Sequence, residues 1–287
     1  MNLRKPNAEC FVPDGLAPEG ALARVTHLGI GAHQDDLEFM ALHGILACFH
    51  HPEGRWFGGV TCTDGAGSAR AGGYRECTDA GMREIRRAEQ RAAAVLGHYA
   101  AMLQLDYASA EIRGPGCGGL VDDLEAVLRA ARPETVYTHN LADKHDTHIA
   151  VAAAVVAAAR RLPADARPSA LYGCEVWRGL DWMNDAEKTV LDVSGHDHLA
   201  AALAGVFDSQ IAGGKRYDLA TAGRRAANAT FFESHVTDRV SQAIFAMDLT
   251  PLLRDPSLDP VAYALGFIDR FRDDVAARLR ARFGAND

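Results

Sequence analysis

The chain has 287 residues, of which 48% are hydrophobic and 24% are charged, and its formal net charge is -8. This composition is typical of a globular protein with a substantial core, and the acidic balance argues against binding to the phosphate backbone of nucleic acids. The six cysteines form no C-x-x-C pair, so neither a zinc ribbon nor a disulfide framework is predicted. The N-terminus lacks an apolar signal segment and no apolar run could span a bilayer, which predicts a cytoplasmic protein without membrane insertion.

Strands and helices are predicted to alternate over residues 25–162. Short apolar runs predict four strands, at Val25–Ala32, Trp56–Thr63, Met102–Tyr107 and Thr135–His139. Apolar residues at helical spacing predict four helices, at Leu37–Phe49, Ala80–Leu96, Leu120–Ala131 and Thr147–Leu162. The alternation predicts an α/β fold in which a mostly parallel sheet has helices on both faces.

The pattern weakens in the C-terminal part of the chain. Ala170–Trp177 predicts a strand, and His196–Ser209 and Pro260–Phe283 predict helices. We interpret residues 1–287 as a single domain in which residues 25–162 form the core and residues 163–287 form an elaboration that shapes the substrate site.

The first polar cluster directly follows the first predicted strand. It contains His33, Asp35 and Asp36, and it lies at the rim of the sheet where ligands bind in open parallel folds. Two neighbouring carboxylates repel each other, and a divalent cation would offset that repulsion. One carboxylate can then bind the ion while the other stays free to act as a base.

A second polar cluster follows the strand Thr135–His139. It comprises Asp143, His145, Asp146 and His148. Residues three apart share a helical face, so the two histidines can point into one cleft. Each cluster alone also fits a helix cap or a polar surface, but their common place at one rim favours a metal site.

The two clusters together offer a ligand set for one ion, namely His33, Asp36 and His148. Three N/O ligands with an open position suit catalytic Zn²⁺, and ligation without thiolates also permits Fe²⁺ or another divalent metal.

Four segments resemble one family. GAHQDDLEFMALHGI resembles the A-H-P-D-D-x-E signature of the LmbE-like (PIG-L) family of metal-dependent N-acetylglucosaminyl deacetylases, and KHDTHIAVA is similar to its second, H-x-x-H signature. Between them, TDGAGSA and REIRRAEQRAAAVLG resemble the T-x-G-x-x-G loop and the R-x-x-E-x-x-x-A-A-x-x-L-G helix. The resemblance covers about residues 25–162, and later FDSQ (Phe207–Gln210) resembles an S-Q element of several members.

The resemblance implies a Rossmann-like three-layer sandwich and hydrolysis of the N-acetyl group of an N-acetylglucosamine-type sugar or glycoconjugate. By motif position it implies His33, Asp36 and His148 as the metal ligands. Asp35 would be the general base that deprotonates the attacking water. His145 would protonate the leaving amine or stabilise the tetrahedral intermediate, and Arg86 would contact a substrate hydroxyl or phosphate.

The sequence departs from the family pattern at two places. Gln34 replaces the usual proline, and Thr147 occupies the place of an aspartate in the second motif. The residue that orients His145 is therefore either Asp143 or Asp146. His139, at the end of its strand, is a further candidate for a supporting role behind the metal.

Other features bear on the substrate and on rival functions. We expect the loop 65–73 to form a lid. Trp177, Trp182, Phe231 and Phe232 are candidates for an apolar sugar-stacking wall, although aromatic residues in loops more often belong to a local core. The alternatives are another metallohydrolase on a similar sheet, such as a phosphoesterase, or a catalytically degenerate sugar-binding module. No G-x-G-x-x-G loop follows the first strand, which argues against a nucleotide-binding module. The expected partners are an amino-sugar substrate and further copies of the chain in a homo-oligomer.

Overall fold

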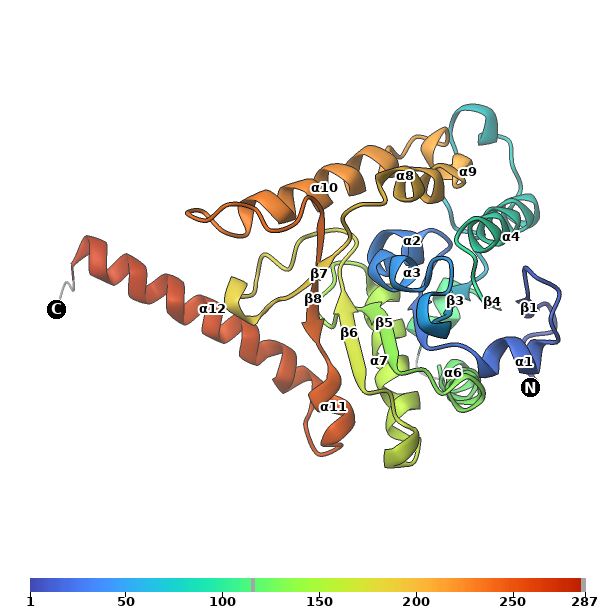
Figure 1. Ribbon diagram of the computed structural model, residues 1–287, viewed down its shortest axis with the longest axis horizontal. Helices are drawn as coiled ribbons and strands as arrows, with labels where there is room; N and C mark the ends of the chain where they lie inside the picture. The colour runs from blue at the N-terminus through green and yellow to red at the C-terminus, as the bar shows by residue number, and fades with distance from the viewer. Residues whose placement is uncertain (115–116, 285–287) are drawn as a thin grey trace.

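The computed structural model describes residues 1–114 and 117–284, and its centre is an eight-stranded sheet (Figure 1). The strands are β1 (Glu9–Phe11), β2 (His27–Gly31), β3 (Phe57–Thr63), β4 (Ala101–Tyr107), β5 (Thr135–His139), β6 (Ala170–Cys174), β7 (Thr189–Asp192) and β8 (Ala243–Asp248). Their order is β1-β4-β3-β2-β5-β6-β8-β7. The central strands β4, β3, β2, β5 and β6 are parallel, whereas β1, β8 and β7 add antiparallel pairings at the edges.

This topology confirms the predicted α/β fold with a mostly parallel sheet. From β2 the chain builds outward through β3 and β4, and it then returns to add β5 and β6 on the other side of β2. The crevice between β2 and β5 is thus the point where the strand order reverses, which is where open α/β sheets bind ligands.

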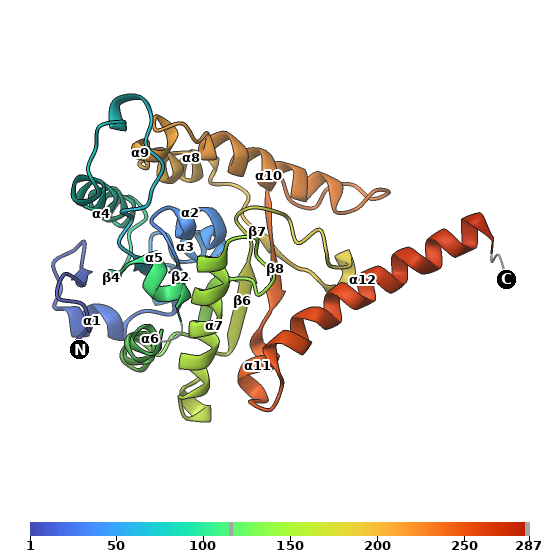
Figure 2. The ribbon, with the colours of Figure 1, turned by 180° about the vertical axis from the view of Figure 1, so that it is seen from behind.

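Twelve α-helices occur in the described part of the chain. They are α1 (Pro18–Ala23), α2 (Asp36–Met40), α3 (Leu42–Cys48), α4 (Asp79–Leu96), α5 (Ser109–Arg113), α6 (Gly118–Ala131), α7 (Asp146–Arg160), α8 (Asp197–Gly205), α9 (Asp208–Ile211), α10 (Tyr217–Phe231), α11 (Thr250–Arg254) and α12 (Pro260–Phe283). Helices α2, α3, α4 and α8 lie on one side of the sheet, and α1, α6, α7 and α11 lie on the other (Figures 1 and 2).

Each face of the sheet has its own hydrophobic core. Leu28, Ile30 and Val155 belong to the core on the α6–α7 side, and Leu37 and Phe57 belong to the core on the α3 side. Because successive residues of a strand point to opposite faces, one apolar strand supplies both cores. This explains why the central strands appear in the sequence as continuous apolar runs.

Two predicted helices are broken. The helix expected over Leu37–Phe49 is divided into α2 and α3 at Ala41, whose φ of -103° and ψ of 16° depart from helical values. The helix expected over His196–Ser209 is divided into α8 and α9 at Phe207, where φ is -88° and ψ is 53°. The second break turns Ser209 toward α4, where its backbone N–H and its hydroxyl both donate to Glu89.

Helix α10 packs against β8 and α8, whereas α12 extends away from the sheet and carries the C-terminal end of the described chain outward (Figure 1). The bounds of α12 agree with the prediction, whereas α10, β1, β7 and β8 were not predicted. Within residues 1–114 and 117–284, no helix combines the length and the apolarity needed to cross a bilayer.

Candidate active site

The first polar cluster lies at the carboxyl end of β2. Asp36 opens α2, and its Oδ2 accepts a hydrogen bond of 2.6 Å from the backbone N–H of His33. The same oxygen is 3.3 Å from His33 Nδ1. Burial alone would raise the pKa of Asp36, but attraction to His148 and His139 outweighs it and holds that pKa well below its usual range. Asp36 is therefore a buried anion.

His148 reaches this cluster from the first turn of α7. Its Nε2 is 3.6 Å from Asp36 Oδ2 and 3.3 Å from His33 Nδ1. Two ligands that bind one tetrahedral Zn²⁺ at about 2.0–2.1 Å lie about 3.3–3.4 Å apart. The spacing of the three atoms, and their chemistry of two imidazole nitrogens and one carboxylate oxygen, therefore fit a single divalent ion.

Asp143 supports His148 from behind. Its Oδ2 is 3.1 Å from His148 Nδ1, and its Oδ1 accepts a 2.9 Å hydrogen bond from the backbone N–H of His145. A proton on Nδ1 held by this carboxylate leaves the Nε2 lone pair of His148 directed at the cluster. Asp146 is exposed at the start of α7. The structure thus places Asp143 against the His148 ring, while the Nδ1 of His145 accepts from the N–H of Thr147 at 3.3 Å.

His139 is a fourth imidazole beside the cluster. It is fully buried, and its ring stacks on that of His148 at a centroid distance of 3.8 Å. Asp36, His139 and His148 are also close enough to form an alternative ligand set. However, the Nε2 of His139 accepts a 2.9 Å hydrogen bond from the backbone N–H of Ala32, so its lone pair is engaged. We therefore favour His33 as the third ligand and assign His139 to the scaffold.

Asp35 occupies an unusual backbone conformation beside the cluster. Its φ is 91° and its ψ is -28°, a region that costs a residue with a Cβ about 1–3 kcal/mol. Its N–H donates to Gln90 Oε1 at 3.2 Å, and its Oδ2 accepts from Arg86 Nη2 at 2.8 Å. Burial raises the pKa of Asp35 to about 6, with Arg86 opposing the rise and Asp36 adding to it.

Arg86 lies in the middle of a buried ion-pair network. It is only 1% exposed, and besides Asp35 it donates to Glu89 Oε2 at 2.9 Å and to the carbonyl oxygen of Gln34. Glu89 in turn accepts from the N–H and the hydroxyl of Ser209, at 2.6 and 2.8 Å. Arg86 lines the adjoining cavity, and these bonds occupy its two terminal nitrogens, while its Nε has no partner among the described residues. The bonds to Asp35 and Glu89 favour a role in positioning Asp35. Its predicted contact with a substrate hydroxyl or phosphate stays a prediction.

The clusters open into a cavity of about 460 Å³, which we call the catalytic cavity. Its lining includes Asp35, the three proposed ligands, His145, and the loop residues Gly65, Gly67, Ser68 and Ala69. The ring of His145 lies 5.0 Å from that of His33 and 4.7 Å from that of His148. The structure therefore brings together the residues of both motifs in one cavity.

The C-terminal part of the chain completes the cavity with residues that the sequence analysis mostly missed. Tyr217, the first residue of α10, lines it together with Lys215, which precedes that helix. Outside the C-terminal part, Arg113 of α5 also lines it. Of the four aromatic residues considered for a sugar-stacking wall, Trp177 lines the cavity. Trp182 and Phe232 pack against the core on the α7 side, which agrees with the alternative of a local core, and Phe231 is 80% exposed. No periodicity of the sequence distinguished these positions.

The fold and the site define an α/β protein with a His/Asp cluster, suited to a divalent metal, at the switch point of a Rossmann-like sheet. Residues 28–159 match the family model described as "PIG-L: GlcNAc-PI de-N-acetylase". Over these residues the chain matches the PIG-L (LmbE-like) family, as its motifs predicted.

Several solved structures share the fold. The hydratase GalB, a 4-carboxy-2-hydroxymuconate hydratase from Pseudomonas putida, has 20% sequence identity and a TM-score of 0.62, over 78% of this chain and 95% of that one. The N,N'-diacetylchitobiose deacetylase of Pyrococcus horikoshii has 16% identity and a TM-score of 0.62, over 80% and 85%. The A40926 pseudoaglycone deacetylase has 15% identity and a TM-score of 0.58, over 78% and 97%.

At these identities the structural comparisons establish the fold. A search of curated proteins by sequence gave no match. Activity must therefore be argued from the family and from the site.

Proposed function

We propose that the protein is a metal-dependent hydrolase that removes the N-acetyl group from an N-acetylglucosamine-type amino sugar or glycoconjugate. The observation that carries this proposal is the triangle of His33 Nδ1, Asp36 Oδ2 and His148 Nε2, with sides of 3.3 to 3.6 Å, beside the separate carboxylate of Asp35. The family match over residues 28–159 supports the same reaction. A cytoplasmic location and a homo-oligomeric state stay predictions.

The three ligand atoms would hold Zn²⁺, or Fe²⁺ or another divalent ion. When bound, such an ion lowers the pKa of water toward about 7 and polarises a carbonyl oxygen. One structural neighbour, a teicoplanin deacetylase, is described in a zinc-inhibited form, so the activating metal must be measured for this chain.

Asp35 is placed to act as the general base. Its carboxylate is held by Arg86 at 2.8 Å, and its burial favours accepting a proton from the attacking water. Amide cleavage also needs a proton on the leaving nitrogen, because an unprotonated amine leaves poorly. His145 lines the catalytic cavity beside the cluster, with its ring 5.0 Å from that of His33, and it is placed to donate that proton or to stabilise the developing oxyanion.

A hydratase is the second candidate. A base and a site for a divalent ion can also direct water onto a carbon–carbon double bond, and GalB is a hydratase of a carboxylated substrate. Arg113 and Lys215 line the catalytic cavity and form no ion pair within residues 1–114 and 117–284, which favours an acidic substrate. The products separate the two reactions, because only deacetylation releases an amine and acetate.

The first test is metal content together with amine release from N-acetylglucosamine, in the wild type and in His148→Ala. We expect about one bound metal per chain, and we expect His148→Ala to lose both the metal and amine release. His198→Ala, which alters an exposed histidine, is the control and should retain both.

Reconstitution should be run with Zn²⁺ and with Fe²⁺. No bound metal with either ion would overturn the metal site. Bound metal without amine release from any N-acetylated sugar, but with water addition to an unsaturated carboxylic acid, would favour the hydratase.

A further inference from the structure

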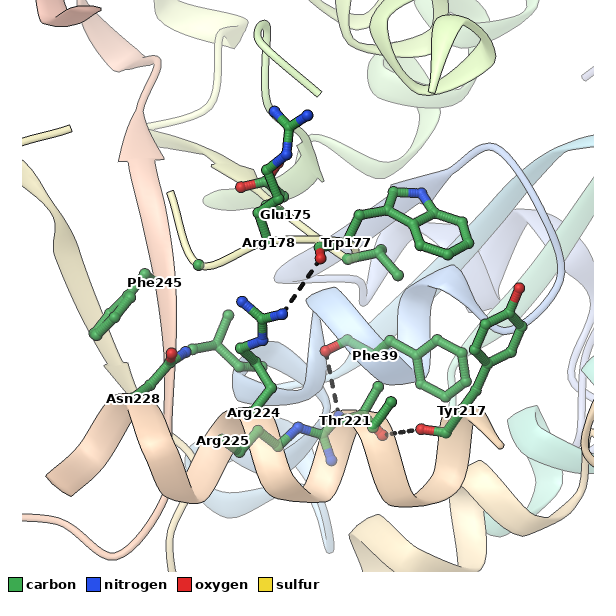
Figure 3. A pocket seen from close by; sticks show the side chains of 14 residues that line it. Phe39, Glu175, Trp177, Arg178, Tyr217, Thr221, Arg224, Arg225, Asn228 and Phe245 are labelled. Atoms are coloured by element: carbon green, nitrogen blue, oxygen red, sulfur yellow. Dashed lines mark hydrogen bonds between the residues drawn. The ribbon is translucent and has the colours of Figure 1, made fainter. Parts of the chain in front are cut away.

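A second cavity of about 140 Å³ adjoins the catalytic cavity (Figure 3), and we call it the side pocket. The loop 175–179 after β6, helix α10 and strand β8 form its walls. Phe39, Val176, Trp177 and Tyr217 line both cavities, so these side chains separate them. A substrate whose amide lies at the proposed metal ligands can therefore extend past these residues into the side pocket.

The walls of the side pocket are built for a flat, partly apolar group. The rings of Trp177 and Tyr217 meet edge to face at 5.9 Å, and those of Phe39 and Tyr217 do so at 5.8 Å. Ile244 and Phe245 of β8 add apolar surface on another side. Except for Phe39, all the lining residues lie outside the segment 28–159 that matches the family.

The charge of the side pocket is opposite to that of the whole chain. Acidic residues outnumber Lys and Arg by 38 to 30 in the sequence, yet the pocket is lined by three arginines and one glutamate. Within the described residues, Arg178, Arg224 and Arg225 form no ion pair with a carboxylate. Positive charge without a carboxylate partner is expected where a ligand supplies the anion.

Arg225 is the strongest sign of such a ligand. It is 4% exposed, and its Nη2 donates to the carbonyl oxygens of Glu38 and Phe39 at 2.6 and 3.2 Å. Its Nε has no hydrogen-bond partner within residues 1–114 and 117–284. Burying a cation without a counter-ion costs free energy, and folding buries Arg225 in this way. An anion in the side pocket would offset that cost.

Arg224 and Glu175 complete the polar lining. Arg224 extends from α10 to the loop 175–179, where its Nη2 donates to the Trp177 carbonyl oxygen at 3.3 Å (Figure 3). Glu175 is 8% exposed; its Oε2 accepts from the N–H of Leu180 at 2.9 Å, and its Oε1 has no partner among the described residues. The free oxygen suits a hydroxyl donor, such as a hydroxyl of a sugar.

We propose that the side pocket binds an acidic, hydroxylated group of the substrate, a carboxylate or a phosphate ester, through Arg224 and Arg225. The proposal rests on the proposed function, because it takes the N-acetyl group to lie in the catalytic cavity. The substrate class is then an anionic N-acetylated glycoconjugate, and the C-terminal part of the chain selects it.

The test is calorimetric binding of matched probes to the wild type, to Arg224→Gln and to Arg216→Gln. The anionic probes are N-acetylglucosamine 6-phosphate, UDP-N-acetylglucosamine and the glucuronate–N-acetylglucosamine disaccharide of hyaluronan. The neutral probes are N-acetylglucosamine and diacetylchitobiose. Arg216 is an exposed arginine paired with Asp218, so its replacement is a control for the loss of one positive charge.

We expect at least one anionic probe to bind the wild type about tenfold more tightly than its neutral counterpart, which is the effect of one charge-assisted contact. Arg224→Gln should remove that preference, while Arg216→Gln should keep it. The carboxylate and phosphate probes distinguish the two sources of the anion. Equal binding of all probes to the wild type would overturn the proposal.

An anion could also bind at the proposed metal ligands, and chelation separates this case. Anion binding that is lost with a chelator but survives Arg224→Gln would overturn the side pocket. Because the readout is binding, an anion preference without amine release would leave the side pocket standing and contradict the deacetylase. Amine release without any anion preference would support the deacetylase and overturn the side pocket.

Discussion

The proposed metal cluster and the side pocket lie on opposite sides of Trp177 and Tyr217. They differ in how their polar side chains are partnered. In the cluster, the two side chains proposed to act on the metal and the water are each held by a charged partner: Asp143 holds His148 at 3.1 Å, and Arg86 holds Asp35 at 2.8 Å. The Nε of Arg86 and the Nδ1 of His139 have no partner within the described residues. In the side pocket, the Nε of Arg225 and the Oε1 of Glu175 have no partners within the described residues.

The difference indicates how each region contributes to function. Groups that must act on a bond have to be oriented before the substrate arrives, and their supporting hydrogen bonds provide that orientation. Groups that recognise a substrate gain most when the substrate itself supplies the missing partner. The cluster is thus arranged for chemistry, and the side pocket is arranged for selection.

Asp35→Asn is the substitution with the largest expected effect, and it tests this contrast. The amide keeps the size of the side chain, and asparagine tolerates positive φ, but it cannot take a proton from water. We expect turnover to fall by about 10²–10⁴-fold, while metal content is retained. Steady-state amine release and metal analysis of the same sample check this. Near-normal turnover would show that another group is the base.

A smaller effect is expected from Asp143→Asn. Loss of the negative charge behind His148 should weaken metal affinity by about 10–100-fold, because the carboxylate both orients the ring and raises its basicity. Competition with a chromophoric chelator measures the affinity. The matched control is Asp146→Asn, on the exposed neighbour in the same motif, which should leave the affinity unchanged. Equal losses in both variants would remove the distinction between the two aspartates.

The smallest expected effect concerns Glu175. Burial raises its pKa from 4.5 to about 7, so between these values the folded state holds a proton that the unfolded state releases. The free energy of unfolding should therefore fall as the pH rises from 5 through 7, by an amount of order 1 kcal/mol. In Glu175→Gln this decrease in the free energy of unfolding should be absent. Glu233→Gln, which alters an exposed glutamate, is the control and should show the same decrease as the wild type. Urea unfolding at pH 5 and pH 8 is the measurement, and identical profiles for the wild type and Glu175→Gln would contradict the assignment.

The sequence predicted the part of the molecule that depends on local patterns. The strands that become β2 and β5 are continuous apolar runs, and each is followed by its cluster of histidines and aspartates. Knowing that both strands end at the same rim was enough to predict that His33, Asp36 and His148 lie together. It was not enough to show that Asp143 contacts the His148 ring, because that contact depends on how the loop closes before α7.

The side pocket could not be predicted for a different reason. Its walls come from the end of β6, from α10 and from β8, which meet because β8 pairs antiparallel with β6 after an excursion of about 70 residues. Such non-local pairing has no counterpart in short-range periodicity. The apolar residues of helix α10 are mostly alanines, and the adjacent arginines Arg224 and Arg225 are typical of a solvated helix surface when only the sequence is considered.

The proposed ligands come from positions up to 115 residues apart in the chain. They can meet around one ion only after β2 and β5 have paired, so the unfolded chain has no comparable site. An ion that binds only the native state adds RT ln(1 + [metal]/Kd) to its stability, or about 2.7 kcal/mol at a hundredfold excess over Kd. Metal supply would then set how much folded protein a cell maintains, as well as how active that protein is.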